Sequence, residues 1–164
     1  ISTGTVNGYS SSITYISIYV IMNLGAFGCI FLMKKDGKYC EDIKDLEGIS
    51  KQNPLLAISF LIIMFSLAGI PPLAGFFAKF YVFMSVIESG MYTLAIVGLL
   101  STVISAFYYL RIIKIIYFDE IKNPFDQIKN FGTTSTVFLT CTMLVFFFLY
   151  PSILNNIVNI LSIN

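Results

Sequence analysis

One charged side chain, Lys79, lies inside the most apolar part of the sequence. It is the only Asp, Glu, Lys or Arg between Lys51 and Glu88. Glu88 follows nine residues later, about 13.5 Å along a helix, which is further than a lysine side chain can extend to reach water. An ammonium at the centre of a bilayer costs roughly 2.5 to 3.5 kcal/mol, so a residue placed there is expected to serve a function. We predict that Lys79 loses and regains a proton near neutral pH; a structural, buried ion pair is the alternative.

Two consecutive prolines precede this lysine in the segment LAGIPPLAGFFAKF (67–80). Pro71 and Pro72 have no backbone N–H to donate to the carbonyls of Leu67 and Ala68, and each disfavours helical backbone at the residue before it. The helix must therefore break, which a bilayer tolerates only where protein or a watery cavity satisfies the backbone. The first half would end with free carbonyls and the negative end of its dipole, so a cation is favoured there.

Polar residues in the other apolar stretches could extend this site. Counting from the turn at 89–91, or from the midpoints of the stretches, places several hydroxyl and amide groups at about the depth of Lys79. They are Asn23, Ser101, Thr102, Ser105, Thr140 and Thr142. Together they could hold a file of waters for lateral proton transfer, although each one alone more commonly bonds to its own helix. Glu88 is half a turn from Lys79 on an ideal helix, so the chain offers Lys79 no carboxylate at its depth.

The composition excludes most other chemistry. The sequence has no histidine, which removes imidazole metal ligation, His-based acid–base catalysis and His-ligated haem. Its three cysteines, Cys29, Cys40 and Cys141, lack CxxC spacing and are expected to be small packing residues. There is no glycine-rich phosphate-binding motif, and a net charge of +1 offers no basic surface for nucleic acid. We therefore assign no metal and no cofactor to this chain.

Long uncharged stretches place these residues in a membrane. The sequence is 57% hydrophobic and 12% charged, whereas soluble domains are about 25% charged, and several uncharged stretches reach the roughly 20 residues of a spanning helix. We predict an all-α fold, a polytopic transmembrane helix bundle that forms a single membrane domain over residues 1–164. About four crossings are expected, one of them a discontinuous, broken helix: 13–33, 54–69 plus 73–87, 92–117 and 133–150.

The distribution of lysine and arginine indicates how the broken helix crosses. Residues 34–53 and 111–129 contain every Lys and Arg except Lys79, whereas the connector after Glu88 and both ends of the sequence have none. Basic connectors gather on one side of a membrane. A single crossing by the broken helix puts both basic regions on the same side, whereas a hairpin would separate them, so a single crossing is predicted.

Two further segments carry weaker signals. Gly25 and Gly28, with Ala26 and Cys29, form a small-residue flank on the first span, where another helix can approach closely. We expect a separate polypeptide to pack against this flank, because the few helices of this chain are not expected to supply the close neighbour. The tail 152–164, which follows Pro151, is apolar and rich in asparagine, and an interfacial helix is expected there.

The sequence resembles the C-terminal part of subunit 2 of respiratory complex I, the subunit N of bacteria. The resemblance covers about residues 13–125 and is carried by IYVIMNLGAFGC (18–29), DIKDLEGISKQNP (42–54), LAGIPPLAGFFAKFYVF (67–83) and AFYYLRIIKIIYFDE (106–120). It implies the antiporter-like fold of fourteen helices, of which this chain would be the C-terminal portion. It also matches Lys79 to the mid-membrane lysine on the broken helix of that family. The family's carboxylate and two further lysines, on earlier helices, have no counterpart in this sequence.

The resemblance implies a part in the proton-translocating membrane arm of NADH:ubiquinone oxidoreductase, with Lys79 in a proton relay and no redox chemistry in this chain. NADH, flavin, iron–sulfur clusters and ubiquinone are expected in other subunits. The expected partners are adjacent antiporter-like subunits, a chain carrying the N-terminal half, and the lipid bilayer. We expect this chain to be the second fragment of a subunit that is split into two polypeptides. Nine lysines against one arginine are typical of an A/T-rich organelle genome, so the mitochondrial inner membrane is expected, with the bacterial cytoplasmic membrane as the alternative.

Two other functions stay open. The membrane subunits of multisubunit sodium/proton antiporters share the PxxxGFxxKF type of motif, which runs here from Pro71 to Phe80. A structural scaffold that does not pump is the other alternative. The KFYVF and MNLGAF stretches favour complex I, and the presence of Lys79 beside a broken helix argues against a scaffold.

Overall fold

The computed structural model describes residues 3–35, 37–40, 42–121, 126–127 and 130–147. Within these residues there are five longer helices: α1 (Val6–Phe31), α3 (Pro54–Ala68), α4 (Ala74–Glu88), α5 (Tyr92–Phe118) and α6 (Phe131–Phe146). The connectors contain a short 3-10 helix, η1 (Ile43–Leu46), the short helix α2 (Ile49–Gln52) and three strands, β1 (Met33–Lys35), β2 (Lys38–Tyr39) and β3 (Asp126–Gln127). The fold is thus mostly helical, as predicted, with a small sheet that the sequence did not predict.

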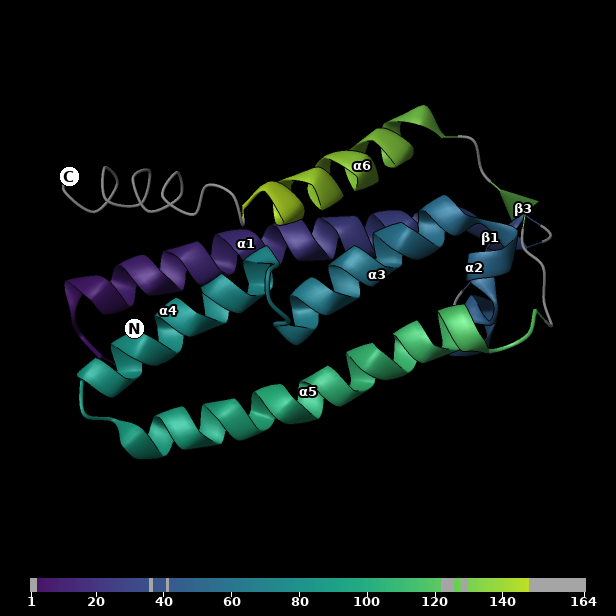
Figure 1. The fold of residues 1–164 in the computed structure, drawn as a ribbon. Coiled ribbons are helices and arrows are strands. Elements are labelled where there is room, and N and C mark those ends of the chain that lie inside the picture. The colour runs from purple at the N-terminus through teal and green to yellow at the C-terminus, as the bar shows by residue number, and fades with distance from the viewer. Residues whose placement is uncertain (1–2, 36, 41, 122–125, 128–129, 148–164) are drawn as a thin grey trace.

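Helices α1 and α5 run the whole length of the molecule in the same direction, and α3 and α4 return between them (Figure 1). Helix α3 covers one half of this distance and α4 the other, so the two lie roughly end to end. Helix α1 packs against both of them and against α6. The pair α3–α4 therefore joins one end of the bundle to the other.

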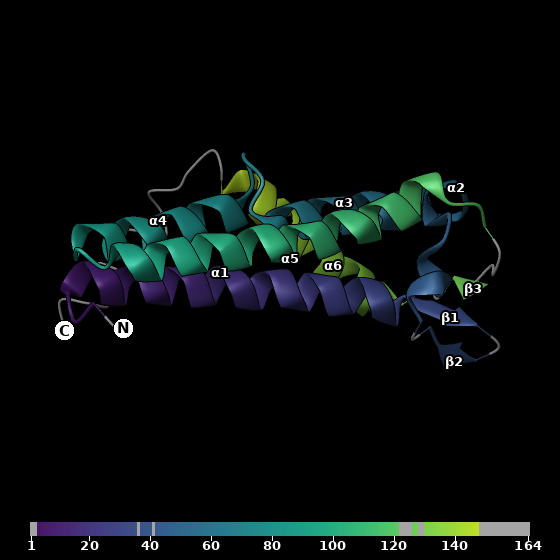
Figure 2. The same cartoon turned by 90° about the horizontal axis from the view of Figure 1, so that it is seen from below.

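The charged connectors meet at one end of the bundle. Strand β1 pairs antiparallel with β2 and with β3, in the order β2-β1-β3. Met33 lies opposite Gln127, and Lys34 opposite Asp126, so the segment after α1 and the segment after α5 are side by side. Figure 2 shows the strands and α2 gathered beyond the ends of α1 and α3. The turn between α4 and α5 and the start of α1 lie at the opposite end (Figure 1).

Helix α1 begins at Val6, seven residues before the span predicted from hydropathy. Thr5 caps it, because its side-chain oxygen accepts a hydrogen bond from the backbone N–H of Gly8 at 3.1 Å. The hydroxyls of Ser12 and Thr14 donate to backbone carbonyls four residues earlier in the same helix. Hydroxyls that bond in this way are compatible with a helix, although they lower the hydropathy from which the span was predicted.

Apolar side chains cover the outside of the bundle as well as its core. Helices α1 and α5 are both long and apolar enough to cross a membrane, and only 6% of the most apolar window of α5 is buried within the chain. Val103, Phe107 and Leu100 are at least 60% exposed. An apolar surface of this extent marks contact with lipid or with other membrane helices.

The small-residue flank of α1 is filled by the chain itself. A Cβ at Gly25 would lie 2.8 Å from the Thr140 Oγ1 and 2.9 Å from the Ile63 Cδ1, and a Cβ at Gly28 would lie 2.7 Å from the Val137 Cγ2. The glycines thus let α6 approach α1 closely. At these two glycines the close neighbour is therefore α6 of the same chain, and the packing of a separate polypeptide against the rest of α1 stays a prediction. The predicted end of the last span at residue 150 and the tail 152–164 lie outside the described residues.

Candidate functional site

Helix α3 ends in a glycine cap. Gly69 has φ 82°, in the left-handed region, which glycine adopts without steric cost. Its N–H donates to the carbonyls of Phe65 at 3.1 Å and Ser66 at 3.0 Å, and the N–H of Ile70 also donates to Phe65 at 3.0 Å. These bonds satisfy two of the last four carbonyls of the helix. The carbonyls of the final two residues remain.

Lys79 supplies the donor for both of these carbonyls. Its Nζ donates to Leu67 O at 2.8 Å and to Ala68 O at 3.2 Å. They are the two carbonyls that Pro71 and Pro72 cannot serve, since a proline has no N–H. The lysine of the second half-helix therefore completes the hydrogen bonding at the end of the first.

Two glycines allow this approach. A Cβ at Gly69 would lie 3.1 Å from Lys79 Cδ and 3.3 Å from Nζ, so any side chain there would crowd the lysine. Gly75, in the first turn of α4, lies directly against the backbone of Ser66, and a Cβ on it would overlap the Ser66 carbonyl oxygen. The Gly75 N–H also donates to the fully buried Ser66 Oγ at 3.0 Å. This contact fixes the start of α4 against the end of α3, and so positions Lys79.

Sequence analysis did not identify Ser66 or Gly75 as site residues. A signal was present, because small residues flank the proline pair on both sides, at 68–69 and at 74–75. Small residues at a helix–helix contact in a membrane let the backbones approach. The serine that accepts the Gly75 N–H gives no such signal, because its role depends on the angle at which the two half-helices meet.

The described groups that stabilise the charge of Lys79 are backbone carbonyls at the end of α3, with no carboxylate beside them. Its ammonium lies at the C-terminal end of α3, where the helix dipole is negative and a cation is stabilised. The side chain is only partly exposed, and no carboxylate among the described residues forms an ion pair with it. Glu88 is exposed, at the far end of α4. Within the described chain, backbone carbonyls rather than an acidic residue hold Lys79.

The six polar residues expected at the same depth bond locally. Each donates to a backbone carbonyl three or four residues earlier in its own helix, at distances of 2.8 to 3.0 Å. They are Asn23 on α1, Ser101, Thr102 and Ser105 on α5, and Thr140 and Thr142 on α6. No described hydrogen bond joins any of them to Lys79, and Thr140 is buried against Gly25. The structure therefore does not bring these six together around the lysine.

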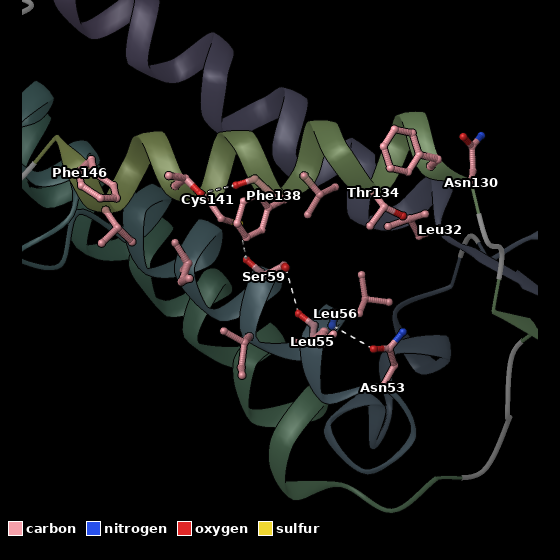
Figure 3. A pocket seen from close by; sticks show the side chains of 16 residues that line it. Leu32, Asn53, Leu55, Leu56, Ser59, Asn130, Thr134, Phe138, Cys141 and Phe146 are labelled. Carbon is pink, nitrogen blue, oxygen red and sulfur yellow. Dashed lines mark hydrogen bonds between the residues drawn. The ribbon is translucent and has the colours of Figure 1, made fainter.

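The described structure also has a hollow that Lys79 does not line. A groove of about 780 Å³ runs between α3 and α6. Figure 3 shows Ser59, Phe138 and Cys141 on its walls and Asn53 and Asn130 at one end. Apart from the thiol of Cys141, its lining has no titratable acid or base, and it does not include Lys79.

Comparison with known proteins gives consistent matches. Residues 1–105 match the model of the family described as "NADH:quinone oxidoreductase/Mrp antiporter, TM". The chain is 53% identical over 163 residues to NADH-quinone oxidoreductase subunit N of Pelagibacter ubique, covering 99% of this chain and 35% of that protein. It is 49% identical over 155 residues to the same subunit of Rhodospirillum rubrum, covering 93% of this chain and 31% of that protein. The chain thus spans about a third of the length of these relatives.

A solved structure shares the fold. A chain of respiratory complex I from Thermus thermophilus, determined with bound aureothin, superposes with a TM-score of 0.77 at 26% identity. The match covers 89% of this chain and 34% of the other. The fold of most of this chain is therefore that of part of a complex I chain.

Proposed function

Because this chain belongs to the NADH:quinone oxidoreductase/Mrp antiporter family of transmembrane proteins, we propose that it forms part of a proton-translocating subunit of an NADH-quinone oxidoreductase. The names of its relatives support the oxidoreductase over a sodium/proton antiporter. The observation that carries the proposal is the pair of hydrogen bonds from the Lys79 Nζ to Leu67 O and Ala68 O.

These hydrogen bonds hold the protonated Lys79 side chain in one position. A charged amine donates strongly to carbonyl oxygens, and the negative end of the α3 dipole favours the same charge. When the ammonium passes a proton to a water molecule or a base, the neutral amine loses this electrostatic hold and gains a lone pair that can accept. Protonation restores the hold. The break in the helix thus supplies a site at which one proton is kept and released.

The topology of a relay follows from the positions of the helix ends. We propose that α3 and α4 together cross the membrane once, with the lysine-rich connectors on one side and the α4–α5 turn on the other. Lys79, in the second turn of α4, then lies near the middle of the crossing. Four crossings by α1, the α3–α4 pair, α5 and α6 make up the C-terminal portion of an antiporter-like subunit.

The rest of the assembly would be supplied by other chains. We propose that NADH, flavin, iron–sulfur and quinone chemistry occur in other subunits, and that adjacent antiporter-like subunits and the N-terminal part of this one enclose Lys79. The relatives named above are bacterial, which favours a bacterial cytoplasmic membrane over the mitochondrial inner membrane expected from composition.

Affinity purification of the tagged chain in mild detergent tests the assembly. We expect the subunits of an NADH-quinone oxidoreductase, including the flavin-bearing and iron–sulfur subunits, to co-purify with NADH oxidation activity. Co-purification with antiporter subunits alone, with sodium-dependent proton exchange and no NADH oxidation, would favour the antiporter. An assembly that oxidises NADH and pumps with full efficiency after loss of the Lys79 amine would favour a scaffold.

A further inference from the structure

A second, smaller cavity lies at the opposite end of the bundle from the charged connectors. It is partly open, has a volume of about 270 Å³, and lies between the first turns of α1, the last turns of α4 and the first turns of α5. Phe83 is one of its lining residues, and the Phe83 ring lies so close to Gly98 that a Cβ on Gly98 would come within 2.8 Å of the Phe83 Cε1. Four hydroxyl side chains contribute to the lining: Thr3, Ser11, Ser12 and Ser85.

Ser85 differs from several other helical serines of the bundle in how its hydroxyl is placed. Its side chain is 5% exposed, and its Oγ is buried with no hydrogen-bond partner in the described chain. By contrast, other helical serines donate to the carbonyl one turn earlier, including Ser12, Ser17, Ser59, Ser101 and Ser105. The Ser85 Oγ faces α1 instead, where a Cβ at Gly8 would lie 3.2 Å from it. A buried hydroxyl left without a partner costs about 1 to 3 kcal/mol.

We propose that this cavity is a water-binding site, in which ordered water hydrogen-bonds to the Ser85 Oγ and to the hydroxyls that α1 and the segment before it contribute. A water needs about 10 to 15 Å³ of such space and two to four polar partners, and 270 Å³ with four hydroxyls provides both for several waters. The cavity brings the aqueous phase to within six residues of Lys79, about 9 Å along α4. The proposal that water binds in this cavity holds whether or not Lys79 acts as a proton relay.

Cysteine accessibility tests the site in sealed vesicles that hold the assembled complex. In a background where Cys29, Cys40 and Cys141 are alanine, Ser85→Cys replaces the hydroxyl with a thiol of similar shape. A small, membrane-impermeant methanethiosulfonate should modify this thiol from the side of the α4–α5 turn and not from the other side, as read by mass spectrometry of this chain. The matched control, Met84→Cys, is on the adjacent apolar face and should react at least ten times more slowly.

Tyr92→Cys, at the exposed start of α5, confirms that reagent reaches that side. If Tyr92→Cys reacts and Ser85→Cys does not, or if Ser85→Cys reacts only from the lysine-rich side, the proposal is overturned. Radiolytic hydroxyl-radical labelling of the unaltered complex provides a measurement that needs no variant. Phe83, which lines the cavity, should be hydroxylated by radicals that radiolysis forms from the bound water, whereas Phe60, buried in the core, should not. Equal protection of both rings would show that another chain fills the cavity, and would also overturn the proposal.

Discussion

Replacing Lys79 with methionine distinguishes the contribution of this side chain to stability from its contribution to proton transfer. Methionine removes both hydrogen bonds to Leu67 O and Ala68 O. Bonds to a charged donor contribute about 1.5 to 3 kcal/mol each, so about 3 to 6 kcal/mol is lost at the break. The same change removes a burial cost of roughly 2.5 to 3.5 kcal/mol for the ammonium. The two terms largely offset one another, and a net destabilisation of at most about 3.5 kcal/mol is expected.

The assembled complex should therefore persist, because the Gly69 cap and the Ser66–Gly75 contact still hold the break together. Protons pumped per NADH oxidised should fall, as measured by fluorescence quenching and NADH absorbance in inverted vesicles. Lys51→Met removes the same charge from an exposed position in α2 and should leave this ratio unchanged.

Lys79→Arg provides the sharper comparison. Arginine keeps the charge and can donate to both carbonyls, but it does not release its proton at physiological pH. It should restore stability without restoring pumping. Wild-type pumping by a fully assembled Lys79→Met complex would refute the proton-relay role, and complete loss of assembly would show that Lys79 acts mainly as a structural anchor.

Changes at the break itself give further tests. The double change Pro71→Ala, Pro72→Ala restores two N–H donors, which compete with Lys79 for the carbonyls of Leu67 and Ala68. Proton pumping should fall more than in either single variant. Unchanged proton transfer would show that the break in the helix is incidental. Gly75→Ala should prevent assembly, because its Cβ overlaps the Ser66 carbonyl oxygen, whereas Gly132→Ala, whose Cβ would meet an ordinary contact at 3.5 Å, should assemble normally on native gels. Ser66→Ala leaves the Gly75 N–H without its acceptor and should destabilise the complex by about 1 to 3 kcal/mol, seen as a lower temperature of thermal inactivation; an unchanged temperature would argue against the contact.

The sequence predicted much of the site because its chemistry is local. A proline has no N–H wherever it stands, so the freed carbonyls of Leu67 and Ala68 could be named from sequence alone, as could a lone ammonium beside them. Their direct bond to Lys79 could not be predicted. It depends on the left-handed turn at Gly69 and on the angle at which α4 follows α3, and the spacing of hydrophobic residues determines neither of them.

The polar residues at membrane depth show the limit of counting along the chain. Depth can be estimated from a rise of 1.5 Å per residue, but the direction in which a hydroxyl points depends on the rotation of its helix and on its rotamer. Counting predicts Thr140 at the depth of Lys79, but its side chain is buried and lies against Gly25 of α1. The two-residue strands β2 and β3 were missed for a related reason, since a segment so short has no period to detect.

A structure of the complete assembly, resolved well enough to locate water, tests the central claim most directly. The Lys79 Nζ should lie within hydrogen-bond distance of Leu67 O and Ala68 O, with a water molecule or a carboxylate from another chain on its remaining side, ready to exchange a proton. If Nζ instead faces lipid, or meets only apolar side chains beyond those two carbonyls, Lys79 has no proton partner and the relay is contradicted.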